Sequence, residues 1–205
     1  MTPRWPELPE RPFNYEEAYA ELAEQMKALH ISRVAEMPRI ELYLDQVLSI
    51  VALELSFMYD LDEKIVTGAM VNNYVKQHIV PPPVKKRYTR RHLASLLFVC
   101  AFKKVLSIAQ IAQIFVMGAA EGVNIESAYD GMIDMFERVL AGLFPEDSSM
   151  RPSRYDGELC IVNSNGDPVS EELERLLENA VFLLAYKVHA DQMLALEARR
   201  LQSAN

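Results

Sequence analysis

The chain has 205 residues, half of them apolar, which suits one compact domain, or a small domain with an accessory lobe, around a sizeable core. It contains no run of about 18 apolar residues, so we expect no membrane span, and its Pro-rich start lacks the apolar run of a signal peptide. The net charge is −8, which taken alone argues against a nucleic-acid ligand.

The charge is unevenly distributed along the chain. Between Glu63 and Glu121 there is no acidic residue, and nine lysines and arginines give this stretch a charge of +9, whereas the rest of the chain carries −17. A local excess of positive charge indicates a nucleic-acid-binding surface better than the net charge of the whole chain does. The acidic total therefore does not exclude DNA.

The N-terminal part predicts a Pro-rich arm at residues 1–13 and then two helices. Asn14 is placed as the N-cap of a helix that runs to about His30. Pro38 separates it from a second helix, from about Glu41 to Tyr59, whose apolar residues recur every three or four positions. These apolar residues are Leu44, Val47, Leu48, Val51 and Leu55.

The middle third predicts a short helix, a basic extended segment and two more helices. Thr67 is placed to cap a helix from Gly68 to Gln77, and the three prolines at 81–83 prevent its continuation. Residues 84–88, which we call the wing, are short, extended and basic. Thr89 then caps a helix over about 90–104 with one apolar face, and Ser107 with Gln110 forms a capping box for the next, to about 117.

The C-terminal part predicts two longer helices around an irregular region at 146–169. One helix runs from Asn124 to about Ala141, and Ser170 caps another that reaches about Leu201. Within the irregular region, Glu158 to Asn163 could form a strand, and Asn165-Gly166 is a turn signal.

The fold class predicted from these elements is all-α: a helix-turn-helix with a short basic wing, packed with additional N- and C-terminal helices and with at most one small β hairpin. We expect a DNA-binding region over 14–120, with the helix-turn-helix at about 64–115. The helical region over 121–205 would serve for dimerisation or effector binding.

Two arginines stand at an unusual place. Arg90 and Arg91 lie in the first turn of a predicted helix, where the helix dipole disfavours each cation by about 0.3–1 kcal/mol. The free N–H groups of that turn bind anions, and Lys85, Lys86 and Arg87 on the wing add to the positive charge. This arrangement indicates a phosphate site.

The short helix at 68–77 has a composition suited to a DNA groove, because its amides, hydroxyl and amine can bond to phosphates or base edges. The candidate DNA-binding residues of the helix and wing are Thr67, Asn72, Asn73, Tyr74, Lys76, Gln77, Lys85, Lys86, Arg87, Tyr88, Arg90 and Arg91. Six of these residues are cations and are the candidates for contacts with DNA phosphates: Lys76, Lys85, Lys86, Arg87, Arg90 and Arg91.

The residues from Asn72 to Pro81, followed by Lys86-Arg87-Tyr88-Thr89, resemble the DNA-binding region of MerR-type winged-helix regulators. Tyr74 matches the tyrosine of that family's recognition helix, Ile79 its turn leucine and Tyr88 its wing tyrosine. The resemblance covers about 64–115 and implies a regulator that binds double-stranded DNA.

This sequence departs from the MerR pattern at three positions. Asn72 and Lys86 stand where that family usually has arginine, and His78 replaces a turn glycine, so it is expected at a positive φ. The stretch from Leu42-Tyr43-Leu44-Asp45-Gln46 to Val71–Lys76 also resembles a bacterial family of unknown function that contains such a module. That resemblance implies a regulator without a named activity.

The sequence offers no pattern for catalysis. The four histidines are far apart, no Gly-rich phosphate loop is present, and no serine lies in a nucleophile elbow. Cys100 lies in an apolar stretch as a buried free thiol, and a cytoplasmic location fits best. We therefore expect no enzyme, metal or cofactor.

Three readings of function remain, and the third and least favoured is an enzyme with a site built from residues distant in sequence. The first is a DNA-binding transcriptional regulator, and the alternative is a protein–protein adaptor that reuses the helix-turn-helix without DNA. The C-terminal helices leave two uses open, a homodimer interface or a pocket for a small-molecule effector. The dimer is expected because one short recognition helix covers few base pairs.

Overall fold

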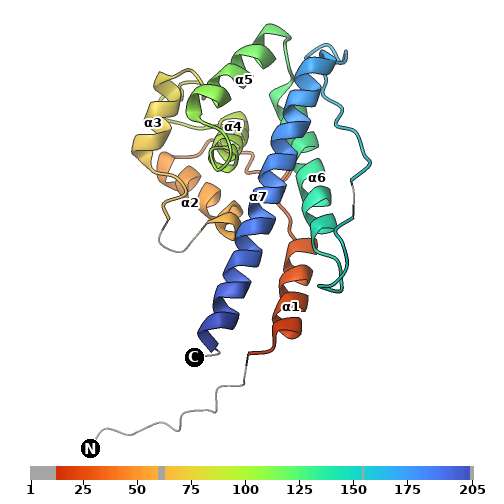
Figure 1. The fold of residues 1–205 in the computed structure, drawn as a ribbon. Helices are drawn as coiled ribbons and strands as arrows, with labels where there is room; N and C mark the ends of the chain where they lie inside the picture. Colours follow the sequence, from red (N-terminus) through yellow and green to blue (C-terminus); the bar gives the residue numbers. More distant parts are fainter. Residues whose placement is uncertain (1–12, 60–62, 154, 204–205) are drawn as a thin grey trace, which may run out of the picture.

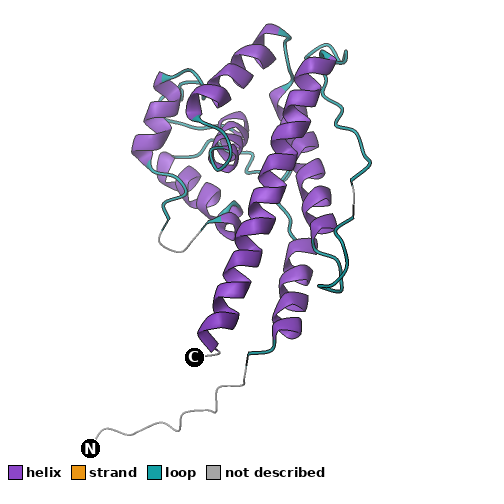
Figure 2. Ribbon diagram, viewed as in Figure 1, coloured by secondary structure: helices purple, strands orange, loops and turns teal. Residues whose placement is uncertain are grey.

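In the computed structural model, residues 13–59, 63–153 and 155–203 are described, and over these ranges the chain folds into seven α-helices and one 3-10 turn (Figures 1 and 2). The elements are α1 (Tyr15–Lys27), α2 (Leu44–Glu54), η1 (Ser56–Met58), α3 (Gly68–Lys76), α4 (Arg90–Phe102), α5 (Ile108–Ala120), α6 (Ile125–Leu143) and α7 (Glu171–Ser203). The predicted all-α class is confirmed. None of these helices is long and apolar enough to cross a membrane.

Helix α4 is the centre of the molecule. It packs against α2, α5, α6 and α7, and Figure 1 shows it nearly end-on between them. All its residues from His92 to Phe102 are buried, so the prediction of one apolar face was too narrow. Large apolar side chains occur on every side of this helix, and such a helix needs partners all round.

The other helices form two groups beside α4. On one side lie α2 and α3, which contact each other, and on the other α6 and α7 run along each other with α1 packed against both (Figure 1). A hydrogen bond from the Tyr19 hydroxyl to the Pro145 carbonyl, 3.1 Å long, ties α1 to the end of α6.

The loop between α1 and α2 is fixed by carboxylates. Four successive backbone N–H groups each donate to a carboxylate at 2.7–2.8 Å, and three of the carboxylates come from α2 and α6. The pairs are Ile31 with Glu137, Ser32 with Glu54, Arg33 with Glu36, and Val34 with Asp130. Because buried N–H groups must be paired, this loop joins α1, α2 and α6 without regular structure.

Two predicted elements are corrected. Helix α2 begins at Leu44 and not at Glu41, because Leu42 is extended and exchanges two backbone hydrogen bonds with Tyr88, 2.8 and 2.9 Å long. Residues 158–163 form no strand: Val162 makes an isolated bridge to Pro168 across a turn in which Gly166 has φ 89°, and Asn163 makes one to Val123.

Candidate nucleic-acid interface

Helix α3 presents one polar face to solvent. Thr67 caps it as predicted, since its Oγ1 accepts from the N–H of Met70 at 3.2 Å. Val71 and Tyr74 point inward, where they are 0% and 3% exposed. The exposed residues of α3 and its C-cap are Ala69, Asn72, Asn73, Lys76 and Gln77. Four of these five side chains can bond to phosphates or bases.

The turn after α3 is held by a left-handed residue. His78 has φ 59°, as its place at a glycine position of the MerR pattern predicts. Its N–H donates to the Val75 carbonyl, and the N–H of Ile79 donates to the Tyr74 carbonyl, which together make a Schellman motif. Ile79 and Val80, both buried, then anchor the chain before the wing.

The wing is a two-residue turn with a strained basic tip. Val84 and Arg87 form a bridge closed by a 2.9 Å hydrogen bond, and between them Lys85 and Lys86 have φ 49° and 61°. Positive φ at both central residues defines a type I′ turn, which favours Asn-Gly. A side chain in this region costs about 1–2 kcal/mol. Such strain is characteristic of functional positions, and here it presents two exposed ammonium groups to solvent.

The base of the wing is held from outside the basic stretch. Tyr88 pairs with Leu42 as described above, and the neighbouring Tyr43 ring carries the Arg87 guanidinium at 3.5 Å from its centroid. Arg87 also donates to the Tyr43 hydroxyl. Sequence reasoning missed Tyr43, because it had been assigned to a helix and lies 44 residues before its partner.

The two arginines that begin α4 have different surroundings. Arg90 is half-buried, and its Nε and Nη2 donate to the carbonyls of Pro38 and Ala35 at 3.3 and 3.4 Å. Arg91 is exposed and its side chain makes no hydrogen bond or ion pair with another described residue. Arg91 is therefore the better phosphate candidate of the pair.

A recess of about 220 Å³ lies against the start of α4. Arg39, Arg90 and Arg91 line it together with Thr89, and so do the carboxylate residues Glu41 and Glu126. Arg39 is a further candidate that the sequence did not single out, because it lies outside the acid-free stretch. The two glutamates limit how much negative charge the recess attracts.

The structure separates the predicted residues into three groups. The side chains of Tyr74 and Tyr88 are buried, at 3% and 4% exposed, so the expectation that they contact DNA is corrected: they support the helix and the wing from the core. Thr67, Arg87 and Arg90 have partners within the protein. The third group is exposed, and its side chains make no hydrogen bond or ion pair with another described residue: Asn72, Asn73, Lys76, Gln77, Lys85, Lys86 and Arg91.

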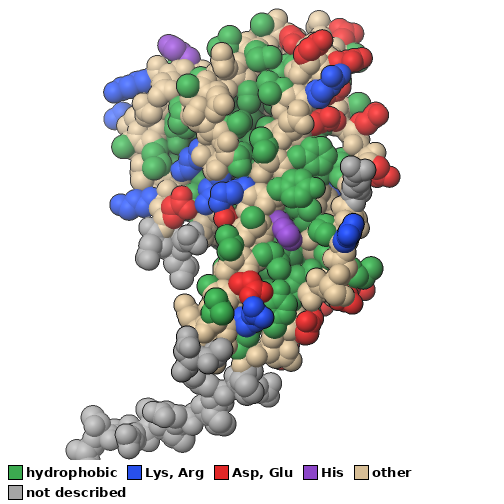
Figure 3. Space-filling view, viewed as in Figure 1, with side chains coloured by type: hydrophobic (Ala, Val, Ile, Leu, Met, Phe, Trp, Pro, Cys, Tyr) green, Lys and Arg blue, Asp and Glu red, His purple; other side chains and the backbone are tan. Residues whose placement is uncertain are grey.

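Two basic residues of the same stretch lie away from this face. Lys103 donates to the Ile65 carbonyl at 2.6 Å, Lys104 pairs with Glu63 at 3.2 Å, and both lie over the Tyr59 ring. Figure 3 shows Lys and Arg side chains along the edge where Figure 1 places α3, and mostly Asp and Glu on the opposite side of the view. Positive charge thus gathers around α3.

His92 links the wing to α4 in a way that depends on protonation. It is buried, and its Nδ1 accepts from the N–H of Thr89 at 3.1 Å and faces the Thr89 hydroxyl at 2.8 Å. Its ring also packs edge-on against Tyr88. Burial lowers the pKa of His92; the nearby Pro82 carbonyl opposes this shift, and Arg91 adds to it. The neutral ring is therefore the form that caps α4.

Acidification is expected to destabilise the protein through this cap. Because the folded pKa of His92 lies below the unfolded value of about 6.5, its contribution is complete above that pH and is lost as the pH falls through the folded pKa. His92→Gln keeps an acceptor, as Gln110 does for Ser107 at 2.8 Å, and should flatten the acid side of the stability curve measured by urea unfolding.

His189→Gln is the control for the His92 experiment, since burial also lowers the pKa of His189, on α7. Each variant should remove its own part of the pH dependence. An unchanged slope in the His92 variant would show that the ring is not titrating against the cap.

Among the described residues, no group of three His, Cys, Asp or Glu side chains is placed to hold a metal ion. No curated protein and no solved structure matches the chain. Residues 32–132, which run from the carboxylate-bound loop through α2 to α5 and into α6, match a family described as a domain of unknown function (DUF1836), and this match covers a little under half of the chain.

Proposed function

We propose that this protein binds double-stranded DNA through α3 and the wing and acts as a transcriptional regulator. The observation that carries the proposal is the exposed face of α3 with Asn72, Asn73 and Gln77, together with four exposed cations of α3, the wing and the start of α4 that have no partner among the described residues. An α-helix fits the major groove, where amide side chains read base edges. In this proposal the wing and the start of α4 contact phosphates of the same duplex.

The salt dependence of binding tests this proposal. Four phosphate contacts per protomer give a slope of log K against log salt of about −3.6, and engagement of Arg87 and Arg90 as well would bring it to about −5.4. Fluorescence anisotropy on a random duplex at several salt concentrations measures this slope. A slope shallower than about −2 would contradict a phosphate-binding face, and no binding even at low salt would favour the protein–protein adaptor.

We infer that the functional form is a homodimer joined through α7. Four leucines lie along one line of this helix and are 38–69% exposed: Leu176, Leu183, Leu194 and Leu201. Their spacings of seven, eleven and seven residues read the same from either end. In an antiparallel pair of α7 helices, Leu183 would therefore face Leu194 of the second copy, as two-fold symmetry requires.

Light scattering across micromolar concentrations checks the dimer. The wild type should have twice the 23.4 kDa mass of one chain, and Leu183→Glu with Leu194→Glu should reduce it to one. Leu53→Glu is the matched control, since Leu53 is 76% exposed on α2. A wild type that stays at the single-chain mass would refute the dimer, and a dimer that survives both α7 substitutions would place its interface elsewhere.

A further inference from the structure

A cavity of about 500 Å³ separates the candidate DNA-binding elements from the C-terminal helices. Its walls come from the turn after α3, from α4 and α5, and from α6 and the start of α7. This volume is typical of small-molecule sites. A molecule bound here would touch both the turn that positions α3 and the helices of the other group.

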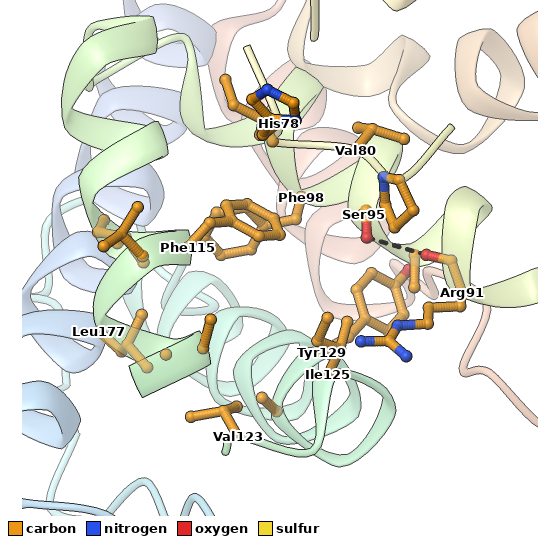
Figure 4. A pocket seen from close by; sticks show the side chains of 18 of the residues that line it. His78, Val80, Arg91, Ser95, Phe98, Phe115, Val123, Ile125, Tyr129 and Leu177 are labelled. Atoms are coloured by element: carbon orange, nitrogen blue, oxygen red, sulfur yellow. Dashed lines mark hydrogen bonds between the residues drawn. The ribbon is translucent and has the colours of Figure 1, made fainter. Parts of the chain in front are cut away.

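The cavity is apolar inside and open at one side. Phe98 of α4 and Phe115 of α5 meet edge to face at 5.5 Å between ring centroids, and Figure 4 shows them in the middle of the pocket. Of its lining residues, Met132 and Leu173 are buried, whereas Val116 is 69% exposed. Apolar surface of this kind favours a hydrophobic ligand.

One end of the cavity is charged. Arg91 is the only Lys, Arg, Asp or Glu among the described lining residues, and Figure 4 shows its side chain beside Tyr129, away from Leu177. The hydroxyls of Ser95 and Tyr129 already donate to the carbonyls of Arg91 and Ser32. The Arg91 guanidinium is therefore left to bind an anionic group, and it matches a carboxylate through two parallel hydrogen bonds.

We propose that this cavity binds a hydrophobic monocarboxylate, with the apolar part over Phe98 and Phe115 and the carboxylate on Arg91. Arg91 is also a phosphate candidate of the DNA-binding face. Provided that the proposed function holds, the carboxylate and a DNA phosphate compete for this side chain. The ligand then lowers the affinity for DNA, and DNA lowers the affinity for the ligand by the same factor.

Calorimetric titration with decanoate, in the absence of DNA, tests the site itself. Decanoate should bind the full chain, and the uncharged decanol should bind at least about tenfold more weakly, because a charge-assisted hydrogen bond is lost. Arg91→Gln should abolish this preference for the acid. Equal binding of the acid and the alcohol to the wild type, or no binding of decanoate, would overturn the proposal.

Substitutions at two neighbouring alanines of α5 test whether decanoate binds within the cavity. Ala119 and Ala120 are both exposed on α5, but of the two only Ala119 lines the cavity. Ala119→Phe should block decanoate binding, and Ala120→Phe should leave it unchanged. Equal binding by both variants would show that decanoate occupies another surface, and thermal unfolding of both reports whether the fold is retained.

The regulatory part is measured separately, as the DNA affinity of the wild type with and without decanoate. If decanoate lowers the DNA affinity of the wild type but not that of Ala119→Phe, the result supports competition through Arg91. Decanoate binding without any change in DNA affinity would overturn the competition. If the protein binds no DNA, the calorimetric result still decides the pocket, so the two proposals fail independently.

Discussion

Replacing Lys76, Lys85, Lys86 and Arg91 together with alanine should lower the affinity for duplex DNA by at least about a hundredfold at 50 mM salt and remove most of the salt slope. These four cations are exposed and have no partner among the described residues, so their loss breaks no hydrogen bond or ion pair with those residues. Alanine keeps a Cβ at the two strained wing positions, so the strain there stays similar. Anisotropy titration measures the affinity, and thermal unfolding should show little change.

A charge-matched variant is the control for this experiment. Lys27, Arg138, Arg151 and Arg175 are exposed on other parts of the molecule, and their replacement with alanine changes the net charge by the same amount. We expect its affinity to stay within about threefold of the wild type, since charges beyond a Debye length are largely screened. Equal losses in the two variants would mean that binding depends on total charge and not on this face.

The second large effect is expected on stability, at the loop between α1 and α2. Glu137 accepts from the Ile31 N–H at 2.7 Å and from the Arg33 guanidinium, and the Arg33 and Glu137 side chains are only 18% and 17% exposed. Glu137→Ala leaves the arginine partly buried without this partner and removes the acceptor of a buried N–H. We expect a loss of about 3 kcal/mol in the free energy of unfolding, measured by urea titration at neutral pH.

Asp134→Ala is the matched control for the loop. Asp134 also binds Arg33, at 2.6 Å, but is 53% exposed, so solvent screens the pair and its loss should cost less than about 1 kcal/mol. Glu137→Gln should fall between the two, because it keeps an acceptor for Ile31 and loses the charge. Similar losses for Glu137→Ala and Asp134→Ala would show that the buried N–H and the burial of the pair contribute little.

The helix starts were predictable because they depend on neighbouring residues. Asn14, Thr67, Ser107 and Asn124 each accept from the N–H three positions later, as their sequence context indicates. Such signals are local. The long predicted C-terminal helix follows the same logic, since Ser170 Oγ accepts from the Leu173 N–H.

The features that were missed depend on residues far apart in the chain. The start of α2 shifted because Leu42 pairs with Tyr88, and Tyr43 joined the wing through Arg87. A pattern within one segment contains no information about such a partner. The same holds for Lys103 and Lys104, which share the charge of the basic stretch but pair with Ile65 and Glu63.

The candidate face was only partly accessible to sequence reasoning for a related reason. Composition showed which residue types were suited to DNA, but tyrosine serves equally well in a core or at a phosphate. Tyr74 and Tyr88 proved to be core residues. Burial decides between these uses, and burial depends on how α2 and α4 pack around them.

The separation of charge within the molecule has a consequence for how the protein would meet DNA. Outside the basic stretch the chain carries −17, so in the proposed complex the phosphate backbone would repel the acidic side and attract the face around α3. Long-range attraction of this kind raises association rates and orients the encounter. In the proposed complex the protein would therefore approach with α3 foremost. Its acidic side would disfavour contacts with a second duplex. The protein would therefore not hold two duplexes together or cover DNA in a continuous layer.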